Sequence, residues 1–311
     1  MTKGRQIDSA TNNRVYLVDA SIYVFRAWFT LPESFTDRDG VPVNAVYGFT
    51  DFVHRLLTDT GAGKIAFAFD QSLTSSFRND IYPSYKANRE SAPDNLMWQF
   101  KRCREFVRLI GLTELCSDRY EADDLIGAAA THARREGSNV TVVTGDKDLM
   151  QLVDEGDLWW DFAKNKRLDS AGVEKQSGVR PEQIADQLAI AGDKIDNIPG
   201  VPGVGMVTAA KLLRHFGTID ELLANLAQIS AMKFRGARRV QHLLEQHRET
   251  ILLAKKLTVL HCDAPLPADL ELRQKWVDNE QLIAFFDQLG FGQPRRDRWC
   301  KLLAQRSPIS S

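Results

Sequence analysis

The sequence predicts an α/β domain built on a mostly parallel sheet, followed by a smaller helical subdomain. Three short runs of β-favouring apolar residues, at 15–19, 65–70 and 140–144, have the length and composition of buried strands. Residues 45–57, 97–110 and 122–133 carry apolar positions at helical spacing. Strands that alternate with helices are typical of a parallel sheet.

The character of the sequence changes after about residue 178. Residues 181–226 have the pattern of short helices joined by Gly/Pro turns, and residues 236–257 predict one long helical stretch. A last helix is predicted at 279–289, ending at Gly290. The predicted parts are a disordered tail at 1–13, an α/β core at 14–180, a helical subdomain at 181–260 and a C-terminal helical segment at 261–311, with 306–311 as a second disordered end.

Composition excludes several classes of protein. No apolar run of the 311 residues is long enough to span a membrane, and the polar N-terminus lacks the apolar stretch of a secretory signal. The four cysteines form no CxxC pair, which argues against a disulfide or zinc framework and favours an intracellular protein. The net charge is −1, but nine of the 41 acidic residues belong to the motifs described next. The other 32 are outnumbered by 40 basic residues, so the remaining surface can be basic.

Acidic residues follow the predicted strands at the points where ligands bind in parallel sheets. Asp19 and Asp70 end two strands, and further carboxylates follow the third strand, open a helix and precede the Gly/Pro turn. The full set is Asp19, Asp70, Glu121, Asp123, Asp124, Asp146, Asp148, Asp193 and Asp196. Any one of them fits an ordinary strand end or helix cap equally well. Together they indicate a site for hard divalent cations, two of which can hydrolyse a phosphodiester.

Five motifs give these carboxylates a specific context. They are VYLVDAS at 15–21, FAFD at 67–70, YEADD at 120–124, TGDKDL at 144–149 and GDKIDNIPG at 192–200. In content and order they resemble the motifs of the bacterial and phage 5′-nuclease family. That family includes the 5′→3′ exonuclease domain of bacterial DNA polymerase I and is related to the flap endonucleases. The likeness extends from about residue 14 to about residue 292.

The resemblance implies a PIN-like core with a helical arch at about 78–105, and a helix–hairpin–helix within 181–260. It implies hydrolysis of DNA by two or more Mg²⁺ or Mn²⁺ ions. The tighter metal site would comprise Asp70, Glu121, Asp123, Asp124, Asp146 and Asp148, with Asp19 nearby, and Asp193 and Asp196 would complete the second. Asp146 is the acidic residue that we expect to be essential for turnover.

The segment after the second strand interleaves basic and aromatic residues. Without the family context, a solvated surface helix with ordinary tyrosine packing fits residues 76–89 better. With that context, the segment resembles the base of the arch. The predicted DNA contacts are Arg78, Tyr82, Tyr85, Lys86 and Arg89, of which Tyr85 would stack on bases. Lys86 would stabilise charge at the scissile phosphate. Arg26 would add a phosphate contact, although a plain helix-surface arginine fits almost as well.

Residues 200–211 combine glycines with the start of a helix. Glycines allow close backbone approach, and helix N-terminal amides bind phosphate without reading sequence. We therefore expect Gly203, Gly205 and Lys211 to contact duplex DNA, with Arg214 extending the basic surface. The alternative is a turn used only for packing. The resemblance also implies a K⁺ ion held by backbone carbonyls of this hairpin.

The resulting hypothesis is a structure-selective 5′→3′ exonuclease or flap endonuclease. Its partners would be DNA with free 5′ ends, flaps or nicks and replication or repair proteins, and it would act as a monomer in the bacterial cytoplasm, associated with the nucleoid. A stand-alone nuclease is expected, although an excised domain would have the same sequence. Three alternatives stay open: a catalytically weak DNA-structure-binding protein, a PIN-like RNA-directed nuclease, and a small-molecule phosphatase. Trp159 and Trp160 are predicted to be core residues, and Cys103 and Cys116 to be packing residues.

Overall fold

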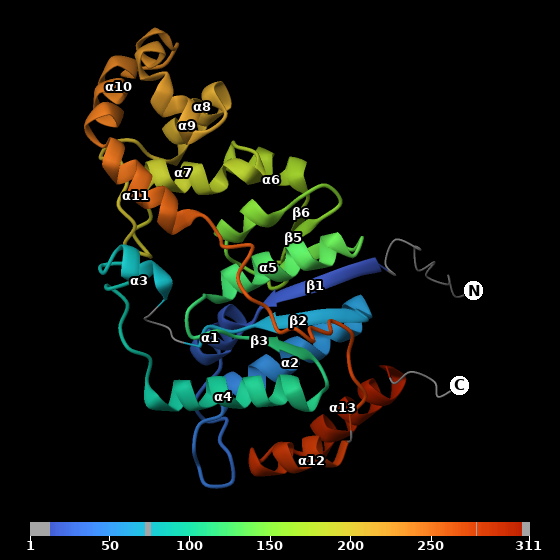
Figure 1. Ribbon diagram of the computed structural model, residues 1–311. Helices are drawn as coiled ribbons and strands as arrows, with labels where there is room; N and C mark the ends of the chain where they lie inside the picture. Colours follow the sequence, from blue (N-terminus) through green and yellow to red (C-terminus); the bar gives the residue numbers. More distant parts are fainter. Residues whose placement is uncertain (1–12, 72–75, 278, 307–311) are drawn as a thin grey trace.

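The computed structural model describes residues 13–71, 76–277 and 279–306 (Figure 1). The two predicted disordered ends therefore lie outside the described residues, apart from Asn13 and Arg306. The described part contains a sheet covered on both faces by helices and, beyond one edge of that layer, a helical subdomain.

The sheet has six strands in the order β3-β2-β1-β4-β5-β6. The strands are β1 (Arg14–Asp19), β2 (Lys64–Ala68), β3 (Thr113–Leu115), β4 (Asn139–Val143), β5 (Leu158–Asp161) and β6 (Lys166–Leu168). All neighbours are parallel except β5 and β6. The predicted mostly parallel sheet and its three strands are confirmed.

Each face of the sheet carries its own hydrophobic core because successive strand residues point to opposite sides. Tyr16 and Val18 pack with α1 (Ala20–Thr30), α2 (Asn44–Thr60) and α4 (Asp94–Leu109), together with the C-terminal helices α12 (Asn279–Gln288) and α13 (Gln293–Arg306). Val15 and Leu17 pack on the other face with α5 (Ala122–Arg135). The central strands are thus buried on both sides, which explains their continuous apolar sequence.

The helical subdomain has a third core. It contains α6 (Ser170–Ser177), η3 (Pro181–Gln183), α7 (Ile184–Ala191), α8 (Met206–Phe216), α9 (Ile219–Ala224), η4 (Leu226–Ala231), α10 (Ala237–Gln246) and α11 (Arg248–Thr258). Helices α7 and α8 with the turn between them form the helix–hairpin–helix. The predicted helical stretch at 236–257 is helical but divided in two, since His247 leaves helical torsion angles and separates α10 from α11. The two helices pack on different partners, α10 on η4 and α11 on α7.

The second half of the predicted arch is also wrong. The arch segment begins with α3 (Phe77–Ile81), but residues from 94 onward form α4. Leu96, Phe100 and Cys103 of α4 are buried in the core against α2 and the sheet. Their helical spacing places one apolar stripe on the sheet, so α4 is a covering helix and not a separate arch.

Smaller predictions have mixed outcomes. Trp159 and Trp160 are buried in β5, and Cys103 is buried, as predicted. Cys116 is exposed beside Arg104, so its predicted packing role is wrong. No helix within the described ranges is long and apolar enough to cross a membrane.

The hairpin between α7 and α8 depends on two glycines that bring backbone segments together. Gly192 has a φ of +76°, and a Cβ atom added there would lie 2.6 Å from the amide nitrogen of Gly200. A Cβ atom added to Gly200 would lie 2.3 Å from the carbonyl carbon and oxygen of Ala191. Gly205, by contrast, has open space around it.

We expect Gly200→Ala to destabilise the protein by about 1–3 kcal/mol, because backbone atoms must shift to accept the methyl group. Gly205→Ser is the matched control: a Cβ atom added there meets no atom within 4 Å, and serine is a good N-cap for α8. Urea unfolding of both variants measures the difference. Equal urea midpoints for the two variants would show that the backbone around Gly200 can shift at no cost to accept a methyl group.

Candidate active site

Carboxylates gather at the edge of the sheet where the parallel strands end. Asp19 is the last residue of β1, Asp70 lies two residues beyond β2, and Asp146 and Asp148 follow β4. The register places Asp19 opposite Ala68 of β2, and Val18 opposite Val143 of β4. The Thr144 hydroxyl donates a hydrogen bond of 2.9 Å to Oδ2 of Asp19, which joins two strand ends directly.

The N-terminus of α5 brings further carboxylates to this edge. The backbone N–H of Ala122, the first residue of α5, donates to Oδ1 of Asp70 at 3.0 Å. Glu121 is the N-cap residue, and Asp123 and Asp124 lie in the first turn. A helix N-terminus favours negative charge, so the macrodipole of α5 stabilises this arrangement.

The carboxylates repel one another. Burial, followed by the charge of Asp70, raises the pKa of Asp19 to about 7. Burial and the charge of Asp146 raise the pKa of Asp148 to about 8, and Asp193 and Asp196 add to that rise. Burial also raises the pKa of Asp146, and it raises the pKa of Asp123 well above its usual range. The hairpin carboxylates therefore lie within electrostatic reach of those at the strand ends.

Arg78 and Asp124 form a buried ion pair. The two Nη atoms of Arg78 lie 2.7 and 2.8 Å from the two oxygens of Asp124, and their residues are 1% and 0% exposed. Arg78 also donates to the backbone carbonyls of Leu257 and Val259 at 2.9 and 3.1 Å. The pair thus joins α3, α5 and the end of α11.

This pair contradicts two predictions from the sequence. Arg78 cannot contact DNA from a fully buried position. Asp124 is not an open metal ligand, since both its oxygens accept from Arg78 and also from the backbone N–H groups of Glu121 and His261.

Residues 82–89, here called the bridging segment, connect α3 to the hairpin loop that carries Asp193 and Asp196. The Lys86 N–H donates to the Asp196 carbonyl at 3.0 Å, and the Asn197 side chain donates to the Ser84 carbonyl at 2.6 Å. Lys86 and Asn197 both have positive φ, +55° each, which non-glycine residues adopt rarely. Such backbone strain is concentrated at functional sites.

Lys86 points its ammonium into the acidic cluster. Nζ is hydrogen-bonded to Oε1 of Glu121 and lies 3.7 Å from Oδ2 of Asp196. Burial alone would lower the pKa of Lys86, but the charges of these two carboxylates raise it. Lys86 therefore stays cationic. Arg89, which is exposed, pairs with Asp196 from the other side.

Tyr85 does not form a base-stacking platform. Its ring is 4% exposed and packs in the core of the helical subdomain. Its hydroxyl donates to Glu121 at 3.0 Å and faces Asp196 at 3.4 Å. Tyr85 thus orients carboxylates, and the prediction of stacking on bases is contradicted. Tyr82 is half-buried against the same core.

Among the residues that the structure describes, no three His, Cys, Asp or Glu side chains are grouped so that they would hold a metal ion. Several of the predicted ligands already have donors within the protein. Glu121 faces Lys86, Asp196 faces Arg89, and Asp70 accepts from α5. Oδ1 of Asp146 accepts from the N–H of Asp148, and Oδ1 of Asp193 accepts from the N–H of Ile195. The predicted ligands surround one region, but internal donors occupy many of their oxygens.

The amino-acid sequence matches two family models that together cover most of the chain. One is described as the N-terminal resolvase-like domain of 5′-3′ exonuclease and matches residues 14–178. The other is described as the C-terminal SAM fold of 5′-3′ exonuclease and matches residues 179–280. The chain belongs to the 5′-3′ exonuclease family. It is therefore a nuclease, and its carboxylate cluster is the candidate active site of a 5′-3′ exonuclease.

Curated relatives of this exonuclease are much longer proteins. DNA polymerase I of Bacillus caldotenax is 38% identical over 284 residues, which are 89% of this chain and 31% of that protein. DNA polymerase I of Mycobacterium tuberculosis is 39% identical over 297 residues, 93% of this chain and 32% of that protein. The chain thus spans about a third of the length of these relatives.

Solved structures share the fold of this exonuclease. T5 5′-exonuclease with bound zinc superposes with a TM-score of 0.66 at 17% identity, covering 95% of this chain and all of that one. The catalytic core of Rad2 in complex with DNA substrate superposes with a TM-score of 0.61 at 14% identity, covering 96% and 94%.

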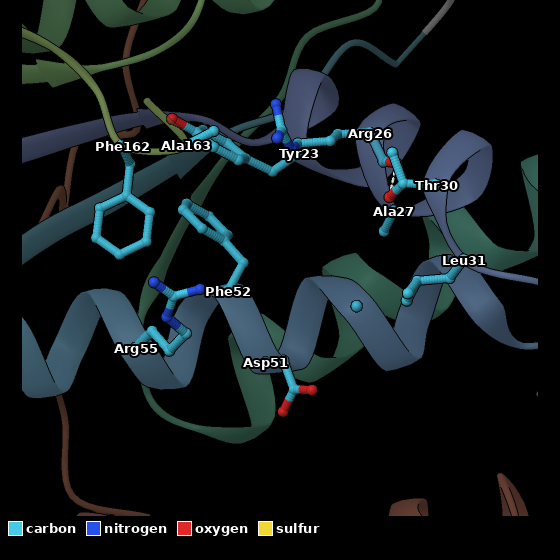
Figure 2. A pocket seen from close by; sticks show the side chains of 11 residues that line it. Tyr23, Arg26, Ala27, Thr30, Leu31, Asp51, Phe52, Arg55, Phe162 and Ala163 are labelled. Carbon is cyan, nitrogen blue, oxygen red and sulfur yellow. Dashed lines mark hydrogen bonds between the residues drawn. The ribbon is translucent and has the colours of Figure 1, made fainter. Parts of the chain in front are cut away.

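The remaining predicted DNA contacts lie on surfaces that DNA can reach. Lys211 is exposed on α8, next to the hairpin. Gly203 has a φ of +82°, and Gly205 begins α8 in open space. Arg26 is exposed on α1, where it lines a pocket with Arg55 (Figure 2). Sequence reasoning missed Arg55, which sits in an ordinary helical pattern. It also missed the contact of Thr144 with Asp19, for which the TGDKDL motif was the available signal.

We expect Arg78→Ala to destabilise the exonuclease by about 3–5 kcal/mol, because it leaves the Asp124 carboxylate buried without its cation. Arg89→Ala removes an exposed partner of Asp196 and should cost no more than about 1 kcal/mol. Chemical denaturation measures both. The double variant Arg78→Met/Asp124→Leu should recover much of the loss, and an Arg78→Ala variant as stable as Arg89→Ala would contradict the role of the buried pair.

The raised carboxyl pKa values also predict how stability depends on pH. The folded protein binds protons at Asp19 and Asp148 near pH 7–8, whereas the unfolded chain binds them near pH 4. The free energy of unfolding of metal-free protein should therefore rise as the pH falls from about 8.5 to 6. Denaturation in chelator across this range measures the slope. Asp148→Asn should make this slope smaller. A free energy of unfolding that decreased as the pH fell from about 8.5 to 6 would contradict the raised pKa values of these carboxyl groups.

Proposed function

We propose that this chain hydrolyses DNA phosphodiester bonds at free 5′ ends and 5′ flaps, with divalent cations held by the carboxylate cluster. One observation carries the proposal: carboxylates from separate elements meet at the strand ends, where burial, and after it their mutual repulsion, raises several of their pKa values. Within a 5′-3′ exonuclease, an excess of buried negative charge at one edge is what bound cations would neutralise.

The donor set fits hard cations. All the predicted ligands are carboxylates, the oxygen ligands that Mg²⁺ and Mn²⁺ prefer. We assign Asp19, Asp70, Asp123, Asp146 and Asp148 to one site, and Asp193 and Asp196 to the second. Two divalent ions there would activate water and neutralise charge on the phosphate. T5 5′-exonuclease, whose fold is shared, has been solved with divalent metal ions, which supports this assignment.

Lys86 would then exchange one partner for another. In this structure its ammonium neutralises Glu121. A phosphate at the cluster would compete for the same ammonium, and Glu121 would keep its ion pair with Nη1 of Arg78, at 2.9 Å, and the hydrogen bond from Tyr85. Lys86 would stabilise the charge that develops on the phosphate, an interaction that is worth most in a site that excludes water. Tyr85 and the bridging segment position Lys86 and Glu121 for this exchange.

The hairpin would hold the duplex beside the cluster. The N-terminal amides of α8 are open at Gly205, and Lys211 lies on the same helix. Backbone amides and a lysine bind phosphates without regard to base sequence. Rad2 has been solved with DNA substrate, which favours DNA as the ligand. A K⁺ ion at the hairpin, a monomeric state, replication or repair partners and a nucleoid location stay predictions.

Cleavage mapping on a 5′-flap duplex, with and without Mg²⁺, tests this function. Asp146→Asn should lower the single-turnover rate by about 100-fold or more, the scale for losing one preorganised charge-stabilising group. Asp59→Asn, an exposed residue at the end of α2, is the control and should cut at the normal rate.

Three results would contradict the proposal. Cutting by Asp146→Asn at the normal rate would remove the carboxylates from the mechanism. Tight flap binding without cleavage by either protein would favour a structure-binding function. Preference for an RNA flap over the matching DNA flap would favour an RNA-directed nuclease.

A further inference from the structure

A pocket of about 280 Å³ lies between α1 and α2, beside the chain that leaves β5 (Figure 2). Three aromatic rings form its inner end. Tyr23 and Phe52 stack at 3.7 Å between ring centroids, and Phe162 meets Phe52 edge-on at 5.4 Å. The helices approach closely here because Gly48 of α2 has no side chain: a Cβ atom there would lie 2.7 Å from that of Ala27.

The pocket carries uncompensated positive charge. Arg26 and Arg55 line it, and no carboxylate in the described ranges forms an ion pair with either. The acidic residue at the rim, Asp51, is already paired with Arg295, at 2.9 Å, and with Arg298. Arg55 lies over the Phe162 ring at 5.6 Å, so a cation and an aromatic face occur together. This combination suits a ligand with a flat ring and an anionic group.

The pocket is a neighbour of the carboxylate cluster. Tyr23 lies one helical turn after Asp19 on α1, and the charge of Asp19 contributes to the raised pKa of the Tyr23 hydroxyl, after burial. In Figure 1 the helix–hairpin–helix lies on one side of the strand ends and α1 and α2 on the other. The pocket between α1 and α2 thus lies across the strand ends from the helix–hairpin–helix.

We propose that the pocket receives one unpaired nucleotide of the DNA strand, next to the bond that is cut. The base would pack against Phe162 and Phe52, and the phosphate would lie at Arg55, because Arg26 extends on the other side of the stacked Tyr23 and Phe52 rings (Figure 2). The volume is just below the usual range of small-ligand pockets, which suits a single nucleotide. This inference rests on the proposed function, and it assigns Arg55, Phe52 and Phe162 as substrate-positioning residues.

The test measures binding of a 5′-flap duplex by fluorescence anisotropy in Ca²⁺ at several salt concentrations. Arg55→Gln should weaken binding about 3- to 10-fold and reduce the salt slope by about one, as expected for one lost phosphate contact. Arg135→Gln, an exposed arginine in the last turn of α5, is the matched control and should leave affinity and slope unchanged.

Phe162→Leu separates stacking from packing. It should weaken binding about 5-fold or more, the lower end of the range for one base–aromatic stack. With a flap whose unpaired nucleotide next to the cut is abasic, the variant and the wild type should bind equally. Arg55 is exposed and Phe162 is partly buried, so thermal melts check that the variants fold.

Equal weakening of Phe162→Leu on normal and abasic flaps would overturn the proposal, as would a salt slope of Arg55→Gln equal to that of the wild type. A third result would also overturn the proposal: Phe162→Leu weakens the binding of free dTMP but leaves the binding of flap DNA unchanged. The pocket would then be a site for the product. Because these readouts are of binding, a failure to cleave contradicts the proposed function alone.

Discussion

The arrangement of this site depends on a repulsion: many carboxylates are held at one edge of a sheet, partly out of water. Parallel strands in register cannot avoid this, since their ends coincide, and four of the acidic side chains have raised pKa values as a result. The surrounding structure compensates in three ways. The N-terminus of α5 offers amides, Lys86 brings an ammonium, and Arg78 removes one carboxylate from the cluster altogether.

Compensation by cations also ties distant parts of the chain together. Arg78 joins α3 to α5 and to the end of α11, and the bridging segment joins α3 to the hairpin loop. The carboxylate edge of the sheet and the hairpin between α7 and α8 are therefore fixed relative to each other by polar contacts around the acidic cluster. A buried ion pair is not in itself a strong source of stability, but it specifies one arrangement over others. Here that arrangement places Lys86 among the carboxylates.

The sequence predicts the fold well because strands and helices depend on patterns of apolar residues that are close together in the sequence. Apolar runs at 15–19, 65–70 and 140–144 match strands, and the motifs identify the carboxylates at their ends. The burial of a polar side chain depends on partners that are distant in the sequence, so the sequence does not predict it. Arg78 and Tyr85 belong to a segment that looks like a basic, aromatic surface. Their partners, Asp124 and Glu121, lie about 40 residues away and are close only in three dimensions. Likewise, the sequence indicates the apolar stripe of α4, but it does not indicate that this stripe faces the sheet.

The C-terminal part of the chain returns to the sheet, and this governs when the fold can form. The N–H of Ile65 in β2 donates to the Leu272 carbonyl at 2.8 Å, and that of Lys275 donates to the Gly111 carbonyl at 2.8 Å. The central strand β1 precedes its neighbouring strands in the chain, and the helices that cover it come from almost the whole described length. Long-range pairing of this kind makes folding slow. On the ribosome, Asp19 of the central strand must wait for Asp196, so the carboxylate cluster can be completed only after the hairpin loop has been synthesised.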